Sequence, residues 1–235
     1  MKKILIILLF AMSTEFAMAQ VQVSRVGVGL SSWGRGAGDE FSSMFQPLNS
    51  TNRSSSLIPS LFATVDLFQG IGVEGRVAIA NSTFTGESVF TGFTLTEEIK
   101  QRIVPLSFGA VYHKGLSDEF TVGAGVGINT YYIQNEVSRT VVGAQGSVNP
   151  TVFSGRTTGA YFKADAEYMF SEIFGVGLDM RYNTGNYNVN FRPEPGAPVQ
   201  TTTNALAGFE IGLSLRVKVA NLFKKSNSDH EGDEI

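Results

Sequence analysis

Charged residues occur at every second position in several stretches of this chain, and they are the residues best placed for polar chemistry. These positions carry acids and bases in nearly equal number. If such a face is enclosed, its charges need partners of opposite sign, because burying a lone charge is costly. We therefore predict an ion network with a structural role, made of these side chains: Glu74, Arg76, Lys163, Asp165, Glu167, Asp179, Arg181, Glu210 and Arg216.

The chain offers few residues for catalysis or metal binding. It has no Cys, and its two His residues are His113 and His230. A hydrolase of the Ser-His-acid type needs those three groups within hydrogen-bond reach, whereas His113 lies beside a predicted turn and His230 lies in the polar C-terminal segment. That segment, residues 224–235, lacks the spacing of a calcium loop. The sequence therefore predicts no enzyme, no cofactor and no metal site.

The first residues have the three parts of a secretion signal. Lys2 and Lys3 form the positive region, residues 4–12 form the apolar region, and a small-x-small cleavage site ends at Ala19. The apolar region is too short to span a bilayer as a helix. We therefore predict a signal peptide at residues 1–19 and an exported protein, in which the lack of Cys excludes disulfides.

Eight segments beyond the signal alternate apolar with small or polar residues, with the period of two that is typical of β-strands. In one of them Val126 and Ile128 alternate with Gly125 and Gly127. Nothing after the signal offers about 18 consecutive apolar residues, so no transmembrane helix is expected. The eight segments are residues 26–31, 60–67, 71–80, 104–112, 120–132, 162–170, 174–183 and 209–219.

The predicted connections between these segments alternate between short and long. The short turns are Gln69-Gly70, 115–118 and 171–173. The long connections, rich in Ser, Thr, Asn, Gly and Pro, are 35–56, 83–96, 134–158 and 186–203. Short periplasmic turns and long outside loops are typical of up-and-down barrels of the outer membrane. The sequence thus predicts an all-β fold, an eight-stranded antiparallel up-and-down transmembrane β-barrel.

The polarity of the two strand faces distinguishes a membrane barrel from a soluble or periplasmic ligand-binding barrel. A soluble barrel encloses its apolar face, and a membrane barrel turns that face to lipid. Lipid offers no hydrogen-bond partners, so the strands must close on themselves. We expect the charged face to fill a narrow lumen without a wide pore. Charges solvated separately in a wet lumen are the alternative to a connected network.

Aromatic residues of the apolar face gather near both ends of the predicted strands, which predicts two girdles at the membrane interfaces. The alternative is that aromatics are simply common in strands. The residues expected near the turns are Tyr112, Phe120, Phe170 and Phe174, and those expected near the long loops are Tyr132, Phe162, Tyr182 and Phe209.

These features, with the segment Arg102-Ile103-Val104-Pro105-Leu106 entering the fourth strand, resemble the outer-membrane β-barrel domain family of the small OmpA-like and OmpX-like type. The resemblance covers nearly all of residues 21–223 and implies a barrel domain over 20–223. The polar composition of residues 224–235 predicts a disordered tail. In that family a terminal aromatic residue, here Phe223, is read by the barrel-insertion machinery. The resemblance implies location and fold rather than chemistry.

The function expected from the sequence is a structural or surface-interaction role through four long outside loops, with an unknown surface partner. A narrow outer-membrane channel for small solutes or ions is the alternative. The expected surroundings are outer-membrane lipid, and we predict a monomer. A net charge of -3 argues against binding nucleic acid.

Overall fold

The computed structural model describes residues 22–35, 50–142, 147–191, 198 and 200–219, nearly all of them in β-strands. In this part of the chain, no helix combines the length and apolar character needed to cross a membrane. The predicted signal peptide (1–19), Phe223 and the predicted tail (224–235) lie outside the described residues.

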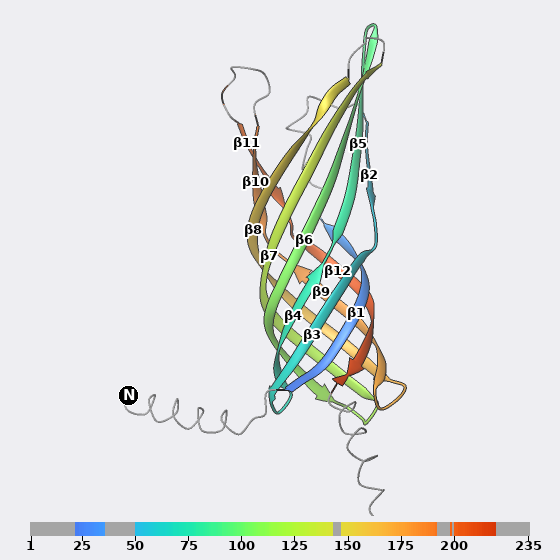
Figure 1. The fold of residues 1–235 in the computed structure, drawn as a ribbon, viewed down its shortest axis with the longest axis vertical. Helices are drawn as coiled ribbons and strands as arrows, with labels where there is room; N and C mark the ends of the chain where they lie inside the picture. Colours follow the sequence, from blue (N-terminus) through green and yellow to red (C-terminus); the bar gives the residue numbers. More distant parts are fainter. Residues whose placement is uncertain (1–21, 36–49, 143–146, 192–197, 199, 220–235) are drawn as a thin grey trace, which may run out of the picture.

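The strands form a closed antiparallel ring of eight, as the sequence predicts (Figure 1). The ring closes where β6 pairs with β7, from Thr94↔Val142 to Gly115↔Thr121. The order around the ring is β1-β3-β4-β6-β7-β8-β9-β12. The strands of the ring are β1 (Gln22–Arg35), β3 (Ile58–Phe68), β4 (Ile71–Ala78), β6 (Phe93–Gly115), β7 (Phe120–Val142), β8 (Ser147–Met169), β9 (Phe174–Asn183) and β12 (Gly208–Lys218).

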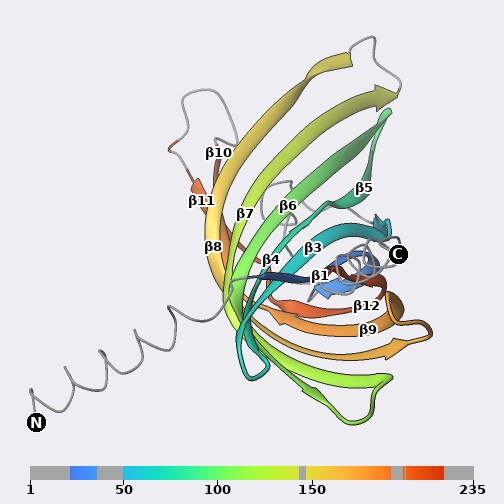
Figure 2. The same ribbon diagram turned by 60° about the horizontal axis from the view of Figure 1, so that its bottom comes forward.

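Tight connections gather at one end of the ring, which we name the turn end (Figure 2). Between β3 and β4 the chain reverses at Gln69 and Gly70, which have φ angles of 45° and 83°. A Cβ at Gly70 would lie 2.3 Å from the carbonyl oxygen of His113, so only glycine fits this turn. Short turns face the periplasm in such barrels, so we name the opposite end the outer end.

Four further strands lie beyond the outer end, two of them in the sheet of the ring and two in a separate two-stranded sheet (Figures 1 and 2). Together with residues 93–103 of β6, 133–142 of β7 and 147–156 of β8, they make up what we name the outer extension. These strands are β2 (Ser50–Ser55), β5 (Ala80–Phe90), β10 (Asn186–Phe191) and β11 (Gln200–Ala205).

The outer extension corrects the prediction that the long connections are loops. Residues 83–96 form a β5–β6 hairpin that stays paired from Ala80↔Ile103 to Phe90↔Phe93. Residues 134–158 are mostly strand, since β7 and β8 each run for 23 residues. Within 186–203, β10 pairs with β11. Thr, Ser and Val suit a pleated backbone when a neighbouring strand supplies the ladder. Of the connection at 35–56, residues 36–49 lie outside the described residues.

The two faces of the sheet exchange polarity near the outer end. Along β7 the outward side chains are apolar at Val126 and Ile128 and become polar at Gln134 and Glu136. On β6 the change falls between Leu106 and Arg102. The inward side chains change in the opposite sense, from polar to apolar. The apolar outward band is therefore confined to the part of the ring between the turn end and Tyr132 of β7, which we name the barrel body.

Candidate functional site in the barrel lumen

The first ionic layer inside the barrel body surrounds Arg216 of β12. Its guanidinium nitrogens lie 2.7 Å from Asp165 Oδ2 and 2.6 Å from Asp179 Oδ1. A third carboxylate, that of Glu167, lies 3.3 Å away. The alternating backbone of β8 and β9 turns these acids inward while their neighbours face out. One buried cation thus holds three carboxylates from two strands.

A second ionic layer surrounds Glu74 of β4. This carboxylate accepts hydrogen bonds from Lys163 Nζ at 2.5 Å and from Arg181 Nη2 at 3.0 Å. Lys163 Nζ is also 3.4 Å from Asp165 Oδ1, which connects this layer to the first. Aromatic rings support the cations, since the Arg181 guanidinium lies 4.1 Å from the ring centroid of Tyr161.

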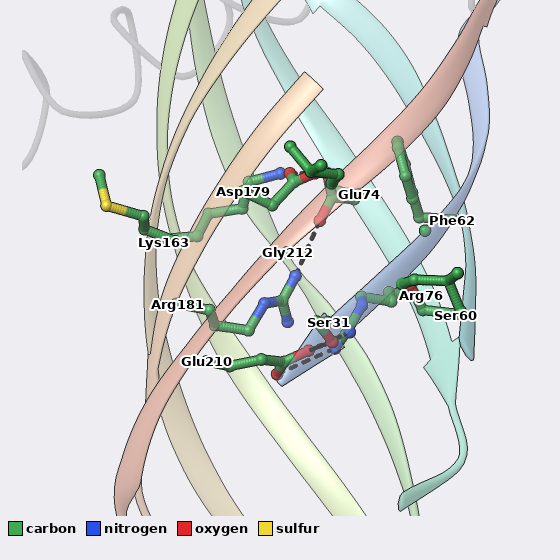
Figure 3. A pocket seen from close by; sticks show the side chains of 14 residues that line it. Ser31, Ser60, Phe62, Glu74, Arg76, Lys163, Asp179, Arg181, Glu210 and Gly212 are labelled. Carbon is green, nitrogen blue, oxygen red and sulfur yellow. Dashed lines mark hydrogen bonds and ion pairs between the residues drawn. The ribbon is translucent and has the colours of Figure 1, made fainter. Parts of the chain in front are cut away.

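Arg76 and Glu210 form an adjacent ion pair (Figure 3). Glu210 also accepts hydrogen bonds from Ser31 Oγ at 2.5 Å and from Asn183 Nδ2 at 3.1 Å. A cavity of about 30 Å³ remains between this pair and the Glu74 layer. Such a volume holds only a water molecule or two.

The structure brings all nine of the charged residues singled out from the sequence into the lumen. Salt bridges and hydrogen bonds connect Arg181, Glu74, Lys163, Asp165, Arg216, Glu167 and Asp179 into one chain. The Arg76–Glu210 pair lines the same small cavity as Glu74 and Arg181. Each of the five acids therefore meets a base from another strand.

The network extends at the turn end to residues that were not predicted from the sequence. Arg25 lies 3.3 Å from Glu167 and 3.4 Å from Asp66. His113 Nε2 lies 3.7 Å from Asp165 Oδ2. Arg25 and His113 both share the inward parity of their strands, so extending the alternation by a residue or two would have found them. In the part of the chain described here, no group of acids and His is arranged to hold a metal ion. His230 lies outside the described residues.

An uncharged polar layer follows on the outer side of the ions. Asn129 of β7 accepts a hydrogen bond from Ser107 Oγ at 2.6 Å and donates to Asn183 Oδ1 at 2.9 Å. Its amide nitrogen also lies 2.8 Å from Tyr131 Oη, and that hydroxyl donates to the Thr184 carbonyl at 2.9 Å. This layer hydrogen-bonds within itself and, through Asn183 Nδ2, to Glu210 of the ion pair below it.

Apolar side chains close the outer mouth of the lumen. Ile103, Tyr131 and Leu206 are completely buried there. The rings of Trp33 and Tyr131 stack with centroids 6.1 Å apart and planes at 18°. We name this set the apolar plug: Trp33, Ile58, Ala78, Ala80, Ile99, Ile103, Tyr131, Ile133, Val137, Tyr187 and Leu206. The apolar plug is not predicted from the sequence, because charged side chains alone were expected in the lumen.

The eight aromatics assigned to the interfaces are all exposed, from 37% for Phe120 to 71% for Phe209. At the turn end Tyr112 pairs with Ile71 beside the β3–β4 turn. Towards the outer end, Phe162, Tyr182 and Phe209 lie on directly paired positions of β8, β9 and β12. The rings of Tyr182 and Phe209 are 4.8 Å apart. Exposed Phe68 and Tyr168 enlarge the turn-end set.

A closed eight-stranded ring with an apolar exterior and a charged interior defines the class of outer-membrane β-barrels. The family described as outer membrane protein beta-barrel domain matches residues 4–219, and the chain belongs to that family. The protein is accordingly an outer-membrane protein that lies in the lipid bilayer.

The comparison with solved structures finds outer-membrane barrels of low sequence identity. OprG from Pseudomonas aeruginosa is 13% identical, with 85% of this chain and 97% of that chain covered and a TM-score of 0.48. The E. coli outer membrane protein W is 15% identical, with 85% and 99% covered and a TM-score of 0.41. The N-terminal barrel domain of P. aeruginosa OprF is 12% identical, with 84% and 98% covered and a TM-score of 0.40. No curated protein matches the chain in sequence.

Proposed function

We propose that this protein is a non-conducting membrane anchor that presents its outer extension to partners outside the cell. The observation that carries the proposal is the continuous filling of the lumen. Two ionic layers, an uncharged polar layer and the apolar plug follow one another from the turn end outward. The ion network has a structural role in this account, and the protein acts as a monomer without catalysis or a cofactor.

The tip of the β5–β6 hairpin supports a role in surface contacts. It is far from the barrel body, and the chain reverses there at Gly92, with a φ angle of 96° (Figure 1). Val89 is 65% exposed and Phe93 39% exposed beside this turn. These exposed apolar side chains at the end of the hairpin are the candidate contact points for a partner. The interfacial aromatics fix the depth of the barrel body, so the tip stands clear of the lipid.

Single-channel recording in planar bilayers tests the filled lumen. A plugged barrel gives no stable open steps, because neither the ionic layers nor the apolar plug leaves a continuous water path. Stable steps of reproducible size would contradict the proposal and favour the narrow channel.

Surface labelling tests the orientation of the extension, and the lack of Cys makes single-cysteine reporters unambiguous. Thr91→Cys, at the hairpin tip, should react with a large, membrane-impermeant polyethylene-glycol maleimide on intact cells. Ser117→Cys, at the turn end, is the matched control and should react only after the outer membrane is permeabilised. The reverse pattern would place the extension in the periplasm and overturn the proposal.

A further inference from the structure

A cleft opens in the wall of the outer extension between β8 and β10. Its volume is about 330 Å³, which lies within the range of small-molecule sites. The strands β7, β8 and β10 supply its walls. The lining residues are Ile133, Asn135, Val152, Phe153, Ser154, Gly155, Tyr187 and Asn188.

The cleft exists because β8 pairs only with β7 in the outer extension and no longer with β9. Pairing between β8 and β9 ends at Tyr161↔Asn183. Beyond it the chain passes Gly185, with a φ angle of 137°, and β10 diverges from β8. Among the described residues, no strand pairing joins β8 to β10. The backbone of β8 therefore leaves hydrogen-bonding groups along a free sheet edge beside the cleft.

The chemistry of the walls is mixed but uncharged. None of the residues that line the cleft is an acid, a Lys, an Arg or a His. Phe153 and Tyr187 supply aromatic surface, and the ring of Tyr187 is held in place because its hydroxyl accepts a hydrogen bond from Gln101 Nε2 at 2.8 Å. Asn188 and Ser154 add polar groups at the mouth.

Asn135 gives the clearest indication of a ligand. Its side chain is only 4% exposed and lines the cleft, yet its Oδ1 atom has no hydrogen-bond partner among the described residues. A buried acceptor without a donor costs about 1–3 kcal/mol. A ligand that places an O–H group at this atom removes that cost.

We propose that this cleft binds an uncharged sugar unit of a glycan outside the cell. A sugar ring offers a C–H face to Phe153 or Tyr187 and hydroxyl donors to Asn135 Oδ1 and the β8 edge. The neutral walls disfavour anionic sugars, and the polar groups disfavour a purely apolar ligand. The site deepens the proposed surface role and rests on it, since an extension outside the cell is needed for the cleft to meet such a glycan.

Binding of the full-length protein in lipid nanodiscs to an array of neutral and anionic glycans tests this site. Binding to one or more neutral glycans, competed by the free neutral monosaccharide, is the expected result. Binding to none of the neutral glycans, or only to sialylated and sulfated ones, would overturn the proposal. Titration with 1-octanol covers the apolar alternative, and binding of octanol without any neutral glycan would also overturn it.

Two variants locate the binding. A Cβ at Gly155 would contact nothing within 4 Å, so Gly155→Phe has room to fill the cleft and should abolish binding. Asn135→Leu removes the acceptor at similar volume and should weaken binding roughly tenfold or more. Gln134→Leu, on the opposite face of the same strand, is the control and should bind as the wild type does.

Heat-modified gel migration confirms that each variant is folded, and Asn135→Ser replaces Asn135→Leu if the latter does not fold. Unchanged glycan binding in Gly155→Phe and in the Asn135 variant would refute this site. Such a failure is distinguishable from failure of the proposed function, because bilayer conductance and tip labelling do not depend on the cleft.

Discussion

The barrel body and the outer extension are built from the same strands, yet they enclose opposite kinds of side chain. In the barrel body β7 turns Ile128 outward and Asn129 inward. Further along the same strand, Ile133 and Val137 face inward and Gln134 faces outward. The backbone alternation does not change, so the medium outside decides which face is apolar. We expect this change of polarity to mark the outer boundary of the membrane.

The comparison also shows that the two interiors need different kinds of stabilisation. The charged interior of the barrel body is stable only if its members are paired, because each removed partner leaves a buried charge. The interior of the extension packs as the core of a soluble protein does, because water rather than lipid lies outside it. Packing of the apolar plug also excludes water from the outer mouth of the lumen.

Removing the central cation should have the largest effect. Arg216→Met leaves Asp165, Glu167 and Asp179 without their common partner and should lower the free energy of unfolding by about 3–5 kcal/mol. Urea unfolding in lipid vesicles measures this loss. Arg102→Met, which removes an exposed cation on the outward face, should change little. A loss for Arg216→Met as small as that of the control would mean that the lumen charges are solvated separately.

A cavity in the apolar plug should cause the next largest loss of stability. Ile103 is completely buried, so Ile103→Ala should lower the free energy of unfolding by about 2–5 kcal/mol. The same change at lipid-facing Ile128 should cost less, because lipid fills the space and no cavity remains. Equal losses at the two positions would contradict the difference between the two interiors.

A charge placed on the outward face should lower the stability in the barrel body but not in the outer extension. Ile128→Lys, in the apolar band, should cost about 2–4 kcal/mol in a bilayer. Gln134→Lys lies on the same face of β7 above the boundary and should cost almost nothing. Unfolding in vesicles measures both variants, and a costly Gln134→Lys would move the boundary outward.

The smallest expected effect is the pH dependence of stability that Glu97 gives to the outer extension. Burial raises the pKa of this carboxyl, although Arg139 Nε, 2.5 Å away, opposes the change. Its folded-state pKa therefore exceeds the ordinary value of 4.5. As pH rises above 4.5 the unfolded chain loses its proton first, so stability falls until the pH passes the folded-state pKa.

Glu97→Gln should flatten this fall, which we expect to be under about 1 kcal/mol. Amide exchange of the outer parts of β6 and β7, corrected for intrinsic rates, measures it between pH 4 and 7. Glu98→Gln, on the opposite face of β6, is the control and should keep the wild-type slope. A fall that is as steep in Glu97→Gln as in the wild type would contradict the assignment.

The sequence predicts the ring and its polarity in the barrel body because lipid demands a strict alternation there. It does not predict the outer extension, since segments rich in Ser and Thr are compatible with both loop and strand until a neighbour pairs with them. Trp33 and Ile103 in the apolar plug could not be assigned from the rule that apolar residues face lipid, because that rule holds only inside the membrane. Which acid meets which base also depends on ring closure, as the contact between Glu74 and Lys163 across the lumen shows.

Depth-resolved accessibility along the outward face of β7 tests the exchange of polarity most directly. Cysteines placed one at a time at Val126, Ile128, Gln134 and Glu136 carry a nitroxide spin label in lipid vesicles. The account predicts collisions with oxygen at Val126 and Ile128, and collisions with a water-soluble nickel complex at Gln134 and Glu136. Nickel collisions at Ile128, or oxygen-rich lipid contact at Glu136, would contradict it.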